Sequence, residues 1–313
     1  MATAEAEAPE GDDRYLLAPY GGARVPGPAW FEAAIAAPRE TGRIAVAGAG
    51  IDYRCWGARG RQGVLLVHGS NAHAGWWDHI GPLLGADFRV AALSLSGMGG
   101  SDWRARYSDA LHAEEMRAVA EAAGLFEGGT PFIVAHSFGG LGLAALATGA
   151  DAARLAGAVF LDSGVMLGRG GKGERPPAFP RRFYPSEREA LARFRPMPSQ
   201  PGCEPWIADH IGRGSLVRSA EGWTWAFDPD LWTKVRLDAA TAPPPPACRV
   251  AFVWGEESAI LTPERVGHQR DWAPPGTPFV AIPGSGHHLM LDQPLALVAA
   301  LRALLAAWGP AHG

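Results

Sequence analysis

The amino-acid sequence predicts an α/β fold built on a mostly parallel central sheet. Short, continuously apolar runs recur along the chain, and stretches with helical patterns lie between them. Parallel strands have both faces covered, so they read as unbroken apolar runs and not as alternating ones. Strands that alternate with helices favour a sheet of this kind. The apolar runs lie in VLLVHG (64–69), FRVAALSLSG (88–97), TPFIVAHS (130–137), LAGAVFLDSG (155–164), RVAFVWGEES (249–258) and TPFVAIPGSGHH (277–288).

Three further segments complete the predicted core. IAVAGAGIDYRCWG (44–57) indicates a β-hairpin before the first parallel strand. HAEEMRAVAEAAG (112–124) has a helical pattern and ends on a glycine, which suits a helix C-terminus. The amphipathic stretch PLALVAALRALLAAW (294–308) predicts a closing helix.

The alternating pattern is interrupted between residues 164 and 246. This stretch is rich in Pro, Arg and Trp, has no clear strand, and ends in four consecutive prolines. We interpret it as a mainly helical cap inserted into the core, with the prolines as a stiff return. The predicted organisation is a disordered acidic tail (1–13), a first part of the core (14–163), the cap insertion (164–246) and a second part of the core (247–313).

Composition excludes several classes of protein. The net charge of −4 gives no basic surface for nucleic acid or an anionic membrane. Three scattered cysteines are too few for a disulfide framework or a zinc site, which favours a reducing compartment. The start of the chain lacks the positive and apolar regions of a secretory signal, and no apolar stretch is long enough to span a bilayer. We therefore expect a cytoplasmic protein with no metal site, and the sequence leaves its oligomeric state open.

Ser137 is the predicted nucleophile. It lies in AHSFGG, directly after the apolar run PFIV and before an apolar helical stretch. A sharp turn from strand to helix exposes the serine hydroxyl, and small flanking residues let the strand and helix approach each other. Gly139 and Gly140 meet that requirement, although Ala135 occupies a position where glycine is usual. The alternative interpretation is a serine that only caps a helix.

Two backbone N–H groups are predicted to stabilise a developing oxyanion. One belongs to Phe138, at the start of the helix after Ser137. The other belongs to Ser70, in the loop after VLLV, with the neighbouring Asn71 as an alternative donor. The same loop continues with His73 and Trp76, which either line the substrate pocket together with Asn71 or simply pack.

His287 is the predicted general base. It follows the last apolar strand in PGSGHHLM, at the carboxyl end of the sheet, where ligands bind in open α/β folds. The adjacent His288 is a rival, but the glycine directly before His287 favours the first histidine.

The acid that would orient the imidazole has two candidates. Asp162 ends the strand AVFLD, and Glu257 follows the strand that ends in WG. Either strand end can supply the carboxylate, which holds the imidazole and stabilises its charged form.

Taken in order, the motifs HG, LSLSGMGGSD, AHSFGG, WGEES and GSGHH resemble the α/β-hydrolase superfamily. The resemblance covers residues 44–162 and 248–308 and implies the α/β-hydrolase fold, in which a helical cap is often inserted after the sixth core strand. Ser258 stands where the family usually has its triad aspartate. Some haloalkane dehalogenases carry this acid at the end of the preceding core strand, the place of Asp162 here, so the resemblance favours Asp162 over Glu257.

The expected function is hydrolysis of a carboxylic ester, a lactone or a related small acyl substrate. Ser137 attacks the carbonyl, His287 accepts its proton, and water then releases the acyl-enzyme, without any cofactor. One alternative is a cofactor-free lyase, haloperoxidase or oxygenase on the same fold. Another is a hydrolase-like receptor that binds its ligand without turnover. Ser258, in place of the usual aspartate, would be consistent with such a loss of catalysis. Aromatic residues of the cap are expected to make the pocket partly apolar.

Overall fold

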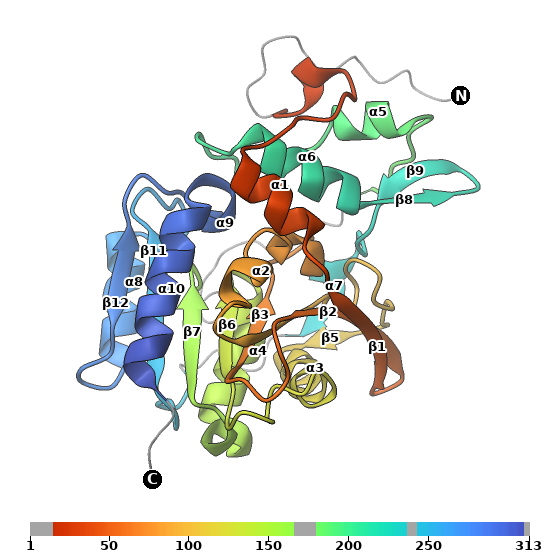
Figure 1. Ribbon diagram of the computed structural model, residues 1–313. Helices are drawn as coiled ribbons and strands as arrows, with labels where there is room; N and C mark the ends of the chain where they lie inside the picture. Colours follow the sequence, from red (N-terminus) through yellow and green to blue (C-terminus); the bar gives the residue numbers. More distant parts are fainter. Residues whose placement is uncertain (1–14, 166–179, 237–242, 310–313) are drawn as a thin grey trace.

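A computed structural model describes residues 15–165, 180–236 and 243–309. The predicted mostly parallel sheet is confirmed, with eight strands in the order β1-β2-β4-β3-β6-β7-β11-β12 (Figure 1). Strands β1 and β2 form an antiparallel hairpin, β2 pairs with β4 in the antiparallel sense, and every other pair in this sheet is parallel. Its strands are β1 (Glu40–Val46), β2 (Ala49–Trp56), β3 (Gly63–Val67), β4 (Arg89–Leu93), β6 (Phe132–His136), β7 (Gly157–Leu161), β11 (Val250–Gly255) and β12 (Phe279–Ile282).

The central strands are apolar throughout because helices cover both of their faces. All residues of β3, β4, β6 and β7 are buried. Alternate residues of β3 enter two separate cores, Leu66 on one face and Leu65 on the other. Helices α2 (Gly81–Leu84) and α10 (Pro294–Trp308) pack on the Leu66 face, and α3 (Asp109–Ala122) and α4 (Gly139–Thr148) pack on the Leu65 face.

Local sequence explains where these elements begin and turn. The predicted hairpin over 44–57 turns at Ala47 and Gly48, which have φ values of 44° and 79°. Two residues with positive φ between paired strands suit the right-handed twist of a hairpin. Helix α3 begins three residues before the predicted start, because the Ser108 hydroxyl accepts a hydrogen bond from Leu111 N at 3.1 Å and caps the helix.

The inserted segment, by which we mean the described residues of 164–246, contains short strands as well as helices. It contains the antiparallel pair β8 (Leu216–Ser219) and β9 (Gly222–Trp225), and β10 (Val235–Arg236), which pairs with β5 (Tyr107–Ser108). The sequence shows no clear strand here because strands of two to four residues are too short to show a period. Its helices are α5 (Glu187–Leu191), α6 (Pro205–Gly214) and α7 (Leu231–Lys234).

The chain upstream of the sheet lies against the inserted segment. Helix α1 (Ala29–Ala36) is next to α6 in Figure 1. The Val25 N–H donates to an Asp209 carboxylate oxygen at 3.3 Å, and the Arg213 guanidinium donates to the Gly22 carbonyl at 2.8 Å. Part of the predicted core, residues 15–36, thus joins the sheet to the inserted segment. The tail predicted to be disordered, 1–13, lies outside the described residues.

Helix α8 (Pro263–Trp272) connects β11 to β12, α9 (Leu289–Asp292) follows β12, and a 3₁₀ turn spans Ala74–Trp77 in the connection after β3. Among the described residues, no helix has the length and apolar character needed to cross a bilayer.

Candidate active site

Ser137 occupies a strained turn between β6 and α4. Its φ is 49°, a left-handed conformation that side chains other than glycine rarely adopt. The turn is held from β7, because Ser137 N donates to the Leu161 carbonyl at 3.0 Å and the Ser163 hydroxyl donates to the Ser137 carbonyl at 2.6 Å. A Cβ on Gly140 would lie 1.9 Å from the Ser163 oxygen, so glycine is required for this approach. The predicted tight turn with small flanking residues is therefore present.

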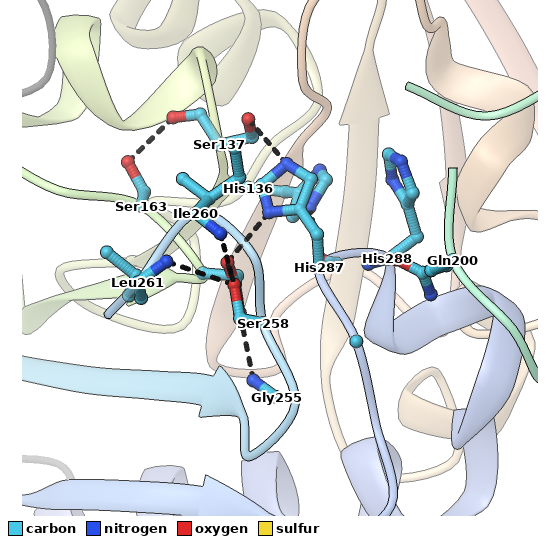
Figure 2. Close-up of polar contacts among 12 residues, drawn as sticks. His136, Ser137, Ser163, Gln200, Gly255, Ser258, Ile260, Leu261, His287 and His288 are labelled. Carbon is cyan, nitrogen blue, oxygen red and sulfur yellow. Dashed lines mark hydrogen bonds and ion pairs between the residues drawn. The ribbon is translucent and has the colours of Figure 1, made fainter. Parts of the chain in front are cut away.

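His287 lies between the Ser137 hydroxyl and a buried carboxylate. Its Nε2 is 2.9 Å from Ser137 Oγ (Figure 2), and its Nδ1 is 2.7 Å from Asp162 Oδ1. Asp162 is fully buried and His287 is 3% exposed. This order of bonds leaves Nδ1 as the donor to the carboxylate and Nε2 as the acceptor for the serine proton. Such a chain can draw the proton from Ser137 while the carboxylate stabilises the imidazolium that forms.

The structure brings Asp162, and not Glu257, to His287. Glu257 is exposed. It contacts the loop between β12 and α9 (residues 283–288, the histidine loop) through its backbone N–H, which donates to the Ser285 carbonyl at 2.9 Å. Asp162 has a positive φ of 41° at the end of β7, which turns its side chain toward the loop after β12. Its second oxygen, Oδ2, accepts from Gly255 N at 2.9 Å.

Ser258 also bonds to this carboxylate, which sequence reasoning missed. Its hydroxyl donates to Asp162 Oδ1 at 2.7 Å, and it accepts from Ile260 N and Leu261 N at 3.1 and 3.0 Å. The sequence marked position 258 only as the place of a missing aspartate. A serine there is consistent with an acid on the neighbouring strand, because it supplies a hydrogen where a second carboxylate would repel the first.

Side chains of α9, β6 and the inserted segment bond to three successive residues of the histidine loop. Gly286 N donates to Asp292 Oδ2 at 2.7 Å, His136 Nε2 donates to the His287 carbonyl at 2.9 Å, and His288 N donates to Gln200 Oε1 at 2.8 Å. Because Gln200 belongs to the inserted segment, the position of the base is tied to that segment as well as to the core.

Gln200 and Asp292 are also bonded to each other. Gln200 Nε2 donates to Asp292 Oδ1 at 2.6 Å. Burial raises the pKa of the Asp292 carboxyl to about 6, although its hydrogen bonds from Gly286, Ser285 and Gln200 act in the opposite direction. No short-range pattern in the sequence links a glutamine at 200 to a loop near 288, so this contact could not be predicted.

The histidines beside His287 are placed differently. His288 faces Trp76 with ring centroids 5.5 Å apart, away from Ser137. Burial lowers the pKa of His136 and of His288 well below the usual value, so both imidazoles are neutral at pH 7. The structure therefore brings the predicted first histidine, and not its rival, to the serine.

Among the described residues, His136, His287 and His288 form a cluster of possible metal ligands. Their nitrogens lie within 4.8 Å of one another. Both ring nitrogens of His287 are already engaged, by Ser137 and Asp162, and His136 Nε2 bonds the His287 carbonyl. As placed, the three side chains do not fit a zinc ion.

The two predicted oxyanion donors flank the Ser137 turn. Among the described residues, neither Phe138 N nor Ser70 N donates to a backbone acceptor. Asn71 N, the alternative donor, is directed at Met98 Sδ, 3.2 Å away. Of the three predicted donors, Asn71 N is thus the one with an acceptor among the described residues.

A cavity of about 360 Å³ lies between the strand-end loops and the inserted segment. Asn71 and Trp76 line it, as one of the two sequence interpretations expected. His73 instead packs in the interior, where its Nε2 is 3.0 Å from Ser215 Oγ and its Nδ1 accepts from Gly75 N at 3.0 Å. The aromatic lining from the inserted segment consists of Tyr184, Phe194, Trp225 and Phe227.

Sequence comparison assigns the family. The model of the alpha/beta hydrolase family matches residues 64–301, which span both parts of the sheet and the site. The chain therefore belongs to the alpha/beta hydrolase family, and the predicted superfamily and fold are confirmed. No curated protein matches the chain.

Solved structures with the same fold include several hydrolases. A Mycobacterium tuberculosis esterase is 23% identical, with a TM-score of 0.66 over 95% of this chain and 99% of that one. A Pseudomonas aeruginosa hypothetical protein is 22% identical, with a TM-score of 0.68 over 86% and 99%. The thioesterase domain of the curacin biosynthetic pathway is 18% identical, with a TM-score of 0.66 over 86% and 100%. At these identities the likeness concerns the fold.

Proposed function

We propose that this chain is a serine hydrolase that cleaves a carboxylic ester or a related small acyl substrate. The observation that carries the proposal is the continuous chain of hydrogen bonds from Ser137 Oγ through His287 to the buried Asp162. The esterase and thioesterase among the structural neighbours support an acyl substrate, as does the strained turn at Ser137.

The proposed reaction has two halves. In the first, the Ser137 hydroxyl attacks the carbonyl carbon as His287 Nε2 takes its proton, and the Phe138 and Ser70 N–H groups hold the oxyanion. His287 then gives the proton to the leaving alcohol, and the acyl group stays on Ser137. In the second half, water attacks the acyl-enzyme as His287 takes its proton, and the acid leaves with Ser137 restored. These steps are complete without a cofactor.

In this proposal the inserted segment acts as a cap over the acyl site. Its aromatic side chains close one side of the cavity, and the volume of about 360 Å³ suits a small molecule. The partner is then a small, partly apolar acyl substrate and not a macromolecule.

Labelling with a fluorophosphonate tests the proposal. We expect the probe to attach to Ser137, with the adduct located by mass spectrometry, and to fail on Ser137→Ala. Ser219→Ala, on the β8–β9 hairpin, is the control and should label like the wild type. A folded wild-type protein that stays unlabelled would overturn the proposal.

The receptor alternative now has less support. Its one favourable feature was Ser258 in place of an aspartate, and Ser258 instead donates to the carboxylate that contacts His287. A lyase, haloperoxidase or oxygenase can use the same serine and histidine. Product identification on an ester and lactone panel separates these reactions from hydrolysis.

A further inference from the structure

Three side chains on the wall of the cavity carry buried polar atoms without a partner. They are the Asn71 Oδ1 acceptor, the Trp76 Nε1–H donor and the two ring nitrogens of His288; each lacks a hydrogen-bond partner among the described residues. Trp76 and His288 are only 6% and 4% exposed. Carbonyls of Met197 and Pro198 approach the His288 ring without completing hydrogen-bond geometry.

These atoms lie next to the reacting end of the proposed site. Asn71 follows Ser70, a proposed oxyanion donor, and His288 follows His287 in the chain. The Trp76 and His288 rings are 5.5 Å apart, and the His287 and His288 rings are 4.8 Å apart. Ser70 lines the same cavity as these three side chains, so a group that met them would lie in the cavity that the proposed oxyanion donor borders.

Their chemistry specifies what would fit. The indole N–H can only donate, the amide oxygen can only accept, and a neutral imidazole offers one of each. A hydroxyl group on the substrate satisfies both requirements, since its oxygen accepts from Trp76 while its hydrogen goes to Asn71. A carboxylate or ketone has no hydrogen to give, and an alkyl chain gives nothing.

An unsubstituted acyl chain is penalised here. An alkyl group packed against these side chains leaves a buried donor and a buried acceptor unpaired, whereas a hydroxyl group can pair with both. Sites built to bond a substrate hydroxyl reject analogues that lack it much more strongly than apolar pockets distinguish a methylene.

We propose that Asn71, Trp76 and His288 form a subsite for a hydroxyl group near the carbonyl, so that the preferred substrates are esters of short hydroxy acids. This inference rests on the proposed serine hydrolase function and names its substrate class.

The neighbouring Trp77 provides a matched control. Its indole N–H is also unpaired among the described residues, but Trp77 is fully buried in the core and does not line the cavity. Trp76→Phe and Trp77→Phe thus delete the same N–H on adjacent residues, of which only the first faces the substrate.

The test compares the methyl esters of butanoic, 2-hydroxybutanoic and 3-hydroxybutanoic acid, with hydrolysis followed by proton release. In the wild type we expect kcat/KM for one hydroxy ester to exceed that for butanoate by about tenfold or more. Trp76→Phe should reduce this ratio at least about tenfold, and Trp77→Phe should keep it. If Trp76→Phe does not fold, Asn71→Gly replaces it, since glycine accepts the φ of 57° at this position.

The outcomes separate the two proposals. Equal rates on hydroxy and unsubstituted esters, or equal loss of the ratio in both tryptophan variants, overturn the subsite and leave the hydrolase in place. If no ester is cleaved although Ser137 reacts with the fluorophosphonate, protection of Ser137 by each ester supplies the same ratio. If Ser137 does not react at all, the proposed function itself fails.

Discussion

The sheet core and the inserted segment differ in how their elements are built. The central strands of the core are fully buried, and an apolar cluster covers each face of the sheet; the cluster on the Leu66 face continues into the inserted segment through Leu191, Ile207 and Ile211. The inserted segment has short helices and strands, and it meets the core in part through single polar side chains. These contacts join Gln200 to Asp292, His210 to Asp78, Ser215 to His73, and Asp228 to Tyr107.

Two residues that make these polar contacts also reach loops of the candidate site. Gln200 reaches the histidine loop, and Ser215 reaches the loop that carries Ser70. The core therefore places the candidate catalytic groups, and the inserted segment is bonded to loops that carry two of them or their neighbours. We infer that changes in the core abolish chemistry, whereas changes at these contacts adjust it.

The largest effect is expected from Asp162→Asn. An amide in place of the carboxylate favours the wrong tautomer of His287 and no longer stabilises the imidazolium, so kcat should fall by about 10⁴-fold. Glu257→Gln, on the neighbouring loop, should keep wild-type kcat. The two variants are compared by steady-state ester hydrolysis, and loss of activity in Glu257→Gln alone would reverse the assignment of the acid.

A smaller loss is expected from Gln200→Ala. This variant removes the bonds from the inserted segment to His288 N and Asp292, so His287 is held less firmly, and kcat should fall about tenfold with little change in KM. Gln293→Ala is the control, because it deletes a 3.3 Å bond to Gly284 in the same loop, farther from the base. A merely structural role would lower the free energy of unfolding and leave both kcat and the pH profile of kcat/KM unchanged.

Ser258→Ala should have a weaker effect within the core. The hydroxyl is one of several groups that hold Asp162, and the Gly255 N–H remains to bond its other oxygen. We expect kcat to fall about fivefold, which corresponds to about 1 kcal/mol for one hydrogen bond. Thr262→Ala, at the start of α8, is the matched change; equal activity of the two variants would show that the Ser258 bond is dispensable.

The smallest predicted change concerns stability in acid. His79 Nε2 donates to the Met290 carbonyl at 2.8 Å, and burial lowers the pKa of His79 to about 4. Between this value and 6.5 the unfolded chain binds the proton more readily, so stability falls as the pH is lowered through that window. At pH 5.5 the loss from His79 is about 1 kcal/mol.

His79→Gln should remove this part of the pH dependence. Glutamine can keep the bond to Met290 but does not titrate. Urea unfolding at pH 7.5 and pH 5.5 measures the difference, with His268→Gln at an exposed position as the control. The same slope in wild type and His79→Gln would contradict the assignment.

Much of the core and three residues of the site could be predicted from the sequence. Apolar runs such as 64–67 mark strands because both faces of each strand are buried. Ser137 and His287 were selected because each follows such a strand in a glycine-rich turn, and parallel strands bring their carboxyl ends to one edge. Asp162 was preferred on the family resemblance, and the structure places it 2.7 Å from His287 Nδ1.

Only the tertiary structure decided which polar groups meet across long stretches of chain. Ser258 at Asp162, Gln200 at the histidine loop and the unpaired atoms of Trp76 and His288 depend on side-chain directions that no local pattern encodes. Buried positions recur at regular intervals along a helix or strand, so they can be recognised in the sequence. A single hydrogen bond between distant residues produces no repeating pattern. For this reason the sequence by itself determined the sheet and the candidate serine and histidine, and folding determined which groups hold them and which side chains line the cavity.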